Sequence, residues 1–244
     1  GVSDEEYVRF QKAWFAELHS AGYAVPHWPA EWSGSANRQM SVAEQVILYS
    51  ELAAHDAPRL VLAFVGIHHA ASTLLAAGTD AQRRRHLPAI LDGEIWVQGF
   101  SEPEAGSDLA ALRTTARREG EEFVVSGQKL WASGGLHADW CLLLARTDPE
   151  APKRKGISYF LLDMTSPGID VRPIRNAVGD SHFCEIFLDD VTVSRRHADF
   201  HRTGGTFTVS DSGSTQAFSS GETISSPSIA PSTAMSIWPP ARCG

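Results

Sequence analysis

The hydrophobic pattern changes its period near Glu94, and this change constrains the fold more than any other feature. Before it, apolar residues recur at helical spacing. From Ile95 to Val193 the apolar runs are short, β-rich and separated by turn residues. A helix and a strand bury residues with different periods, so the two halves require different elements. The sequence therefore predicts an α+β chain, with a helical domain over residues 1–94 and a small β-barrel domain over residues 95–199.

Four stretches of the first domain are expected to be helical. An apolar stripe marks residues 7–18, and a capping box, residues 41–44, opens the next helix. Residues 60–77 are apolar nearly all round, which is typical of a helix buried on most sides. The last stretch, residues 79–86, is short, polar and basic, and we expect it to end at Pro88.

Eight short runs of the second domain are candidate strands, because each is rich in β-forming residues and bounded by turn residues. They are Ile95–Phe100, Thr114–Arg118, Phe123–Ser126, Cys141–Arg146, Ser158–Asp163, Val171–Ile174, Cys184–Leu188 and Val191–Val193. The dipeptides Glu119-Gly120 and Ser126-Gly127 are expected to form tight turns.

The last part of the chain, residues 200–244, has a different composition. It holds ten Ser, six Thr, five Gly and four Pro among 45 residues, with no sustained helical or strand period. Such a composition buries too little apolar surface to offset the entropy of ordering. We therefore expect an irregular tail.

Composition excludes several classes of function. The net charge of −8 argues against nucleic-acid binding, which needs a basic face. No run of about 18 apolar residues predicts a membrane span. The three widely spaced cysteines predict neither disulfides nor a metal site, and they favour a reducing compartment such as the cytoplasm. The adjacent His68 and His69 point to different helix faces, so they cannot form an i, i+4 metal pair.

Two segments carry the chemical signal. The first runs Gln98-Gly99-Phe100-Ser101-Glu102-Pro103-Glu104-Ala105-Gly106-Ser107-Asp108, leaving a strand through a Gly- and Pro-containing loop. Its backbone N–H groups and hydroxyls could hold a phosphate or a flavin edge, although such a loop is more often a plain turn. The second runs Gly127-Gln128-Lys129-Leu130-Trp131-Ala132-Ser133-Gly134-Gly135. Its Trp could stack on a flat ring, although a lone Trp is more often a core residue.

Taken together, these segments resemble the acyl-CoA dehydrogenase family. Its first loop reads close to T/S-E-P-x-A-G-S-D and its second segment close to G-x-K-x-W-I-T/S, matching residues 101–108 and 127–133. A later pattern, a Gly-Asp before a β run that ends D-D-V-x-V, matches Gly179-Asp180 and residues 185–193. The similarity covers residues 4–196, and three motifs in the family's order make it specific.

The resemblance implies an FAD site and its residues. Gln98, Phe100 and Ser101 would line the flavin, and Gly106 would let the backbone approach closely. Ser107 would contact the cofactor pyrophosphate or the acyl-CoA substrate. Trp131 would lie against the flavin ring, with Ala132 beside it and Ser133 hydrogen-bonded to it. No metal is implied.

The implied reaction is the α,β-dehydrogenation of an acyl-CoA thioester, with hydride transfer to FAD. Electrons would pass to an electron-transfer flavoprotein or a similar acceptor, and the family is homo-oligomeric. Its catalytic Glu lies in a C-terminal helical domain that does not follow Val193 here, so we expect a truncated or frameshifted chain with no catalytic base of its own. Glu102 and Glu104 are carboxylates near the expected flavin, but loop or capping roles are commoner for such residues.

Two alternatives remain open at this stage. The chain could be a non-catalytic remnant that binds FAD or acyl-CoA, or that pairs with a partner supplying the lost domain. It could also be an acyl-CoA oxidase or a flavin monooxygenase, because one fold hosts several chemistries.

Overall fold

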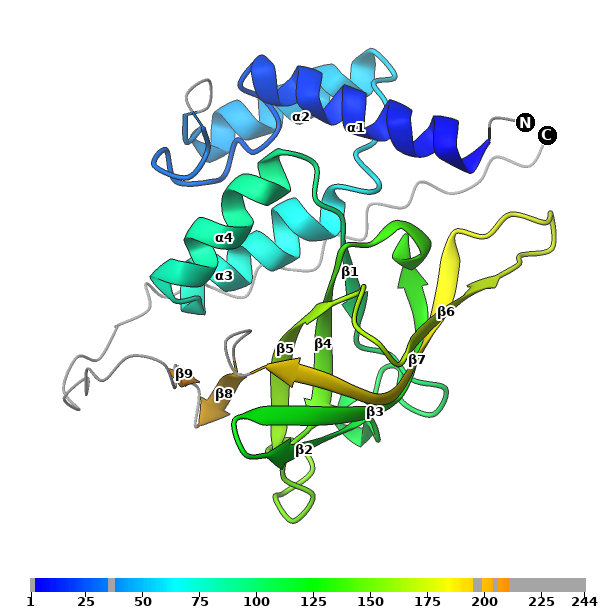
Figure 1. Cartoon of the computed structure of the whole chain (residues 1–244). Coiled ribbons are helices and arrows are strands. Elements are labelled where there is room, and N and C mark those ends of the chain that lie inside the picture. The colour runs from blue at the N-terminus through cyan, green and yellow to red at the C-terminus, as the bar shows by residue number, and fades with distance from the viewer. Residues whose placement is uncertain (1–2, 35–37, 195–198, 204–205, 211–244) are drawn as a thin grey trace, which may run out of the picture. The chain divides into compact units, whose positions relative to one another are not determined.

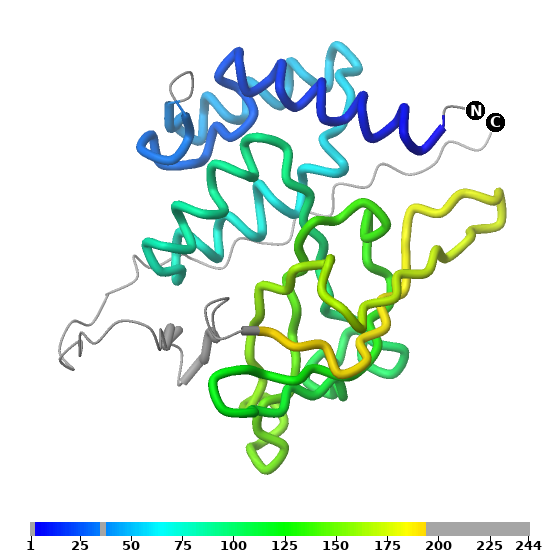
Figure 2. The backbone as a smooth tube through the Cα atoms, in the orientation of Figure 1, coloured from blue at the N-terminus to red at the C-terminus, as the bar shows by residue number. Residues whose placement is uncertain are grey.

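A computed structural model describes residues 3–34, 38–194, 199–203 and 206–210 of the chain. Its first part is helical and its second part is a sheet, which confirms the α+β class (Figure 1). The backbone trace in Figure 2 passes once from α-helices to strands, without returning to α-helix among the described residues.

The helices begin where the sequence places capping residues. They are α1 (Asp4–Ser20), α2 (Val42–Ala54), a π-helix η1 (Val65–Ala70), α3 (Ala71–Ala77) and α4 (Asp80–Leu91). Capping boxes open α1, α2 and α4, with Ser3, Ser41 and Thr79 as the N-cap residues. Each box pairs two backbone N–H groups that would otherwise lack partners, which explains where these helices start.

Two helices differ from expectation. Helix α4 continues past Pro88 to Leu91, and the proline lies close to its last turn. The buried side chains of Leu87, Ile90 and Leu91 pack into the hydrophobic core and stabilise these last residues as helix. The apolar run 60–77 is not one regular helix: its first residues form turns, and the middle is π-helical. A π-helical turn holds one extra residue and is common at functional sites.

The strands form one curled sheet. They are β1 (Trp96–Gly99), β2 (Thr115–Glu119), β3 (Glu122–Ser133), β4 (Trp140–Arg146), β5 (Ile157–Asp163), β6 (Ile169–Ile174), β7 (Phe183–Ser194), β8 (Asp199–Thr203) and β9 (Thr206–Ser210), with 3-10 turns at Leu109–Ala111 and Gly135–His137. The order is β6-β7-β3-β2-β4-β5-β8-β9, and β1 pairs in parallel with β4. The curl in Figure 1 agrees with the expected barrel-like domain.

Strand β3 is longer than predicted, and it contains the whole second motif segment up to Ser133. The predicted turn at Ser126-Gly127 is instead an irregularity inside this strand, between Val125 and Gly127. A Cβ at Gly127 would lie 2.5 Å from Thr114 Oγ1, and its φ is +155°. Glycine is therefore required by close packing here, and not by a chain reversal.

The start of the predicted tail contains regular structure. Strands β8 and β9 pair antiparallel, and Tyr159 of β5 pairs with Phe200 of β8. Composition cannot reveal this hairpin, because strand pairing depends on the neighbouring edge. The rest of the predicted irregular tail, residues 211–244, lies outside the described residues.

Two hydrophobic clusters form the core. One lies inside the sheet, around residues such as Val125, Phe160 and Ile186. The other joins the helices to the sheet and includes Trp96 and Trp140. Tryptophans 96 and 140 stack with ring centroids 5.6 Å apart, and both indole N–H groups donate to the Glu94 carboxylate at 3.0 Å. The boundary between the two halves is thus a packed junction.

Among the described helices, none is both long and apolar enough to cross a membrane.

Candidate functional site

The two motif segments lie side by side. The first loop leaves β1, and the second segment is the end of β3. The Leu130 N–H donates a hydrogen bond of 2.8 Å to the Ser101 carbonyl oxygen. Ser101 is therefore bonded to the residue that directly precedes Trp131, which is the proximity that a shared flavin wall requires.

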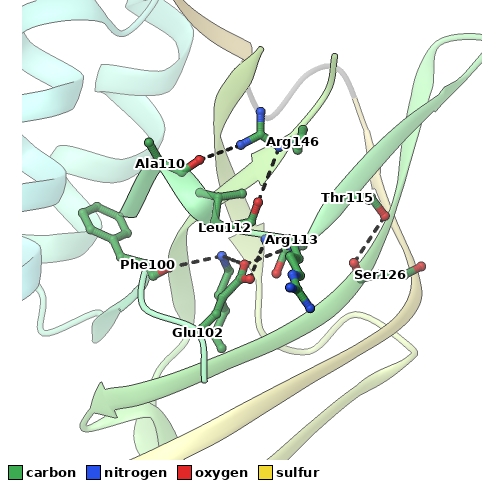
Figure 3. A network of polar contacts seen from close by, with 10 residues as sticks. Phe100, Glu102, Ala110, Leu112, Arg113, Thr115, Ser126 and Arg146 are labelled. Atoms are coloured by element: carbon green, nitrogen blue, oxygen red, sulfur yellow. Dashed lines mark hydrogen bonds and ion pairs between the residues drawn. The ribbon is translucent and has the colours of Figure 1, made fainter. Parts of the chain in front are cut away.

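A buried ion pair supports this junction. The Lys129 ammonium lies 2.8 Å from Glu102 Oε1 and 3.3 Å from the Phe100 carbonyl oxygen. The carboxylate also accepts backbone N–H groups of Arg113 at 2.6 Å and Thr114 at 3.0 Å (Figure 3). Burial raises the pKa of this carboxyl group, but bonds from Lys129, Thr114 and Arg113 outweigh it and lower the pKa below 4.5. Glu102 is therefore an ionised anchor for the loop.

Trp131 stands out from the sheet. Its indole is 56% exposed, although β3 is otherwise largely covered. The strand has an irregular register between Lys129 and Ala132, and Trp131 has a φ of +61°. A β-bulge re-aims side chains, and a positive φ is rare for a bulky residue. The Phe183 ring and the indole form a T-shaped pair with ring centroids 5.8 Å apart. An exposed, strained aromatic is a feature of a binding surface.

The rest of the first loop is open. Gly106, Ser107 and Asp108 are exposed, and a Cβ at Gly106 would meet nothing within 4 Å. Asp108 forms an ion pair with Lys153. Glu104, the second candidate carboxylate, is exposed and pairs with Arg113 at 2.7 Å. The loop thus leaves space for a ligand at the glycine, with its carboxylates already paired.

An arginine fixes the turn after this loop. Arg146 of β4 donates from Nη2 to the Ala110 carbonyl oxygen at 2.8 Å and from Nε to that of Leu112 at 3.4 Å (Figure 3). These carbonyls end the 3-10 turn, so the arginine holds the loop's far end. Lys129 of β3 holds the near end through Glu102 and the Phe100 carbonyl oxygen. The loop is clamped at both ends by side chains from the sheet.

The π-helix and strand β5 support the start of the loop. The Gln98 side-chain amide is hydrogen-bonded to His69 Nδ1 of the π-helix. The Phe100 ring packs edge-on against Tyr159 at 5.9 Å. Ala132 differs from the other predicted contacts: its side chain is 1% exposed and lies in the core, so only its backbone could face a ligand. Ser133, at the end of β3, is exposed.

Sequence reasoning gave no role to Lys129, His69 or Tyr159. A signal existed for Lys129, because it falls on the period-2 series of Phe123 and Val125 and should therefore face inward. No comparable local signal exists for the other two, which reach the loop from distant parts of the chain.

The basic run on α4 has structural roles. Arg83 donates to the carbonyl oxygens of Leu74 at 3.2 Å and Gly78 at 2.7 Å, and so caps the end of α3. Arg85 lies over the Trp140 ring at 5.7 Å and pairs with Glu94 at 3.3 Å. Of the adjacent histidines, His68 stacks on His27 and His69 is hydrogen-bonded to Gln98. The described residues contain no group of three or more His, Cys, Asp or Glu suited to a metal ion.

A cavity of about 680 Å³ lies elsewhere, along α2. It is lined by residues of the helical part, including Trp14, Ile47 and Leu52. None of the predicted flavin contacts lines it. We therefore place the candidate site at the junction of the motif segments, where strain, exposure and clamped loops coincide, and not at this cavity.

Family models match both halves of the chain. The model "Acyl-CoA dehydrogenase, N-terminal domain" matches residues 2–94, and "Acyl-CoA dehydrogenase, middle domain" matches residues 98–191. A model of the FHA domain also matches residues 176–230. Part of that stretch is β7, which pairs with β3 along most of its length in the sheet described above.

Curated relatives agree with the first two matches. FadE34, an acyl-CoA dehydrogenase of Mycobacterium tuberculosis, is 50% identical over 179 residues, 72% of this chain and 24% of FadE34. IpdE1, an acyl-CoA dehydrogenase of the same organism, is 42% identical over 188 residues, 77% of this chain and 48% of IpdE1. The chain thus spans at most about half of the length of these relatives.

A solved structure shows the same arrangement of elements. The Tcur3481-Tcur3483 steroid ACAD superposes with a TM-score of 0.70 at 34% identity, covering 84% of this chain and 50% of that chain. The motif segments, the helix-then-sheet architecture and the two domain matches lead to one conclusion. The chain belongs to the acyl-CoA dehydrogenase family, of which it carries the N-terminal and middle domains.

Proposed function

We propose that this chain supplies the FAD-binding wall of an enzyme that dehydrogenates acyl-CoA thioesters between the α and β carbons. The observation that carries this proposal is the hydrogen-bonded junction between the Ser101 loop and β3, where the exposed indole of Trp131 projects from a strained backbone. A flat aromatic face beside a polar loop suits a flat ring with polar edges.

The residues present fit FAD. Trp131 offers an exposed face, Ser101 and Ser133 offer hydroxyl groups, and the space at Gly106 admits close approach of a pyrophosphate. Ser107, also exposed, is the proposed contact for pyrophosphate or acyl-CoA. FAD, when bound, supplies the acceptor for the hydride that leaves the β carbon. The protein's own contribution is to orient the ring and to hold the loop through the buried Lys129–Glu102 pair.

The two glutamates of the first loop are poor candidates for the base. Glu102 is bound to Lys129 and two backbone N–H groups, and Glu104 pairs with Arg113. We propose that the base which removes the α proton comes from outside the described residues or from another chain. An electron-transfer flavoprotein or a similar acceptor, and assembly with further chains, also belong to this proposal.

The test begins with a titration of FAD into the purified chain, followed by its absorption and fluorescence. We expect binding that Trp131→Ala weakens and that Phe10→Ala, which truncates another exposed aromatic on α1, leaves unchanged. Equal binding by all three proteins, or none by the unmodified chain, would contradict the proposed wall.

A second step identifies the chemistry. Acyl-CoA thioesters with straight-chain and steroid acyl groups are added to the FAD-loaded chain, because one structural relative is titled a steroid ACAD. Bleaching of the flavin band would indicate dehydrogenation by the chain itself. Bound flavin without bleaching would indicate that the base is supplied elsewhere. Rapid peroxide formation would instead favour an oxidase.

A further inference from the structure

His69 contacts a predicted flavin residue from outside both motif segments. It lies in the π-helix Val65–Ala70, and its Nδ1 is hydrogen-bonded to the Gln98 side-chain amide on β1. The two residues are 29 positions apart in the sequence. This contact crosses from the helical half to the strand that leads directly into the Ser101 loop.

The next helical turn makes a second contact of the same kind. Thr73 Oγ1 donates to the His69 carbonyl oxygen at 2.9 Å, so the two side chains lie on one face of the helix. The Thr73 side chain is hydrogen-bonded to Tyr159, whose ring packs on Phe100. Gln98 is thus contacted directly by this helical face, and Phe100 is linked to it through Tyr159.

The neighbouring histidine points elsewhere. The His68 ring stacks on His27 at 4.7 Å, with only 9° between the planes. Phe64 packs on both histidines, at 4.9 Å from His68 and 5.4 Å from His69. His68 therefore shares the helix and the Phe64 contact with His69, but its ring stacks on His27.

Burial favours the uncharged ring of His69. Desolvation lowers the pKa of His69 from 6.5, so the ring is neutral at pH 7. A neutral Nδ1 without a proton accepts a hydrogen bond from the Gln98 amide N–H. The same bond fixes which end of the amide, nitrogen or oxygen, is turned away from the helix.

We propose that His69 is a positioning residue that sets the orientation of the Gln98 amide at the flavin edge. This inference rests on the proposed FAD site. A glutamine amide presents either a donor or an acceptor according to its rotation, and a flavin edge carries both kinds of group. Because the Gln98 amide is already held in one rotation, FAD binding does not have to offset the entropy of ordering this side chain.

The experiment compares four proteins by two readouts. The proteins are the unmodified chain, His69→Ala, His69→Asn and His68→Ala, each checked for an unchanged unfolding temperature. One readout is the NMR signal of the Gln98 side-chain amide in the FAD-free chain, assigned with Gln98→Glu. The other is the dissociation constant for FAD from fluorescence titration.

We expect His69→Ala to shift the Gln98 amide signal and to weaken FAD binding by about threefold to tenfold, the effect of one net hydrogen bond. The Asn carbonyl can accept the same bond, so His69→Asn should restore affinity to within about twofold. His68→Ala should change neither readout.

The outcomes separate this inference from the proposed function. An unmoved Gln98 signal, or a moved signal with unchanged FAD affinity in His69→Ala, overturns the positioning role while the FAD site stands. Equal weakening by His68→Ala also overturns it, because the effect would then be general to the helix. No FAD binding by the unmodified chain overturns the proposed function, and the positioning role with it.

Discussion

At the scale of single residues, Trp131 and Glu102 show two ways of shaping one site. Trp131 holds a backbone conformation that is unfavourable for an aromatic residue, and its indole remains exposed. Glu102 is buried and satisfied by three hydrogen-bond donors. A strained, exposed side chain beside a rigid anchor is the arrangement expected where a ligand, and not the core, has shaped the local structure.

The strain at Trp131 is measurable. Both Trp131→Gly and Trp131→Ala remove the indole, but only glycine adopts a φ of +61° without a Cβ penalty. We expect the free energy of unfolding of Trp131→Gly to be about 1 kcal/mol higher than that of Trp131→Ala, so that the glycine variant is the more stable one. Both variants should lose FAD affinity equally. Urea unfolding of the two variants checks this, and equal stabilities would show that the backbone is relaxed.

Removing one member of the buried ion pair should be costly. Glu102→Gln leaves the Lys129 charge without its partner in the core, so we expect a loss of about 3–5 kcal/mol in the free energy of unfolding. The control is Glu104→Gln, whose pair with Arg113 is exposed and should contribute no more than about 1 kcal/mol. Adding Lys129→Met to Glu102→Gln should recover part of the loss. Similar losses for both glutamates would contradict the buried pair.

At the scale of elements, β3 and the π-helix depart from regular geometry where they approach the site. The motif residues were recognisable in the sequence, yet the sequence predicted a strand that stopped at Ser126 instead of Ser133. The reason is that Gly127 is a poor β-former and is typical of turns, so the local pattern predicts a strand end before it. Only pairing with β7 makes the segment a strand. Likewise, the apolar run around His69 has no local feature that separates a π-helix from an α-helix.

The π-helix should make the protein sensitive to acid. Burial, followed by the charges of His27 and His69, lowers the pKa of His68 from 6.5 to about 4. The unfolded chain therefore binds more protons between these values, and stability falls as the pH decreases from 6.5 towards 4. We expect His68→Asn to show a smaller fall in unfolding temperature over this range.

The matched control for this prediction is His55→Asn, an exposed histidine at the end of α2. The fall in its unfolding temperature with pH should match that of the unmodified chain. An identical acid response in His68→Asn would mean that other groups, such as His27, account for the whole effect.

At the scale of the whole molecule, the described helices are unequally covered. Helix α2 has no buried residue, and Val42, Val46, Ile47 and Tyr49 are exposed on it. The other regular helices each contribute residues to the core. Exposed apolar side chains in one place promote association, so this surface is expected to limit the solubility of the chain.

Charged substitutions on α2 test this directly. Val46→Lys and Ile47→Glu replace side chains that are 60% and 62% exposed. We expect the free energy of unfolding to change by no more than about 0.5 kcal/mol, and self-association in sedimentation velocity to decrease. A substantial loss of stability would show that these side chains are covered in solution.

The junction between the two halves is also a property of the whole molecule. Trp96 and Trp140 were assigned to strands or their edges from sequence, but their stacking and shared acceptor, Glu94, follow only from the fold. The same holds for Arg146, which reaches the turn after the first loop from β4.

The sequence by itself determined the class of the fold, the change from helix to strand near Glu94, the capped helix starts and the two motif segments. These depend on periodicity and on residues close together in the chain, which can be read locally. The tertiary structure alone decided that Lys129 and Glu102 form a buried pair, that Trp131 is turned outward by a bulge, and that His69 reaches Gln98. Such contacts join distant segments, so they depend on how strands and helices pair and pack, and no local pattern encodes that.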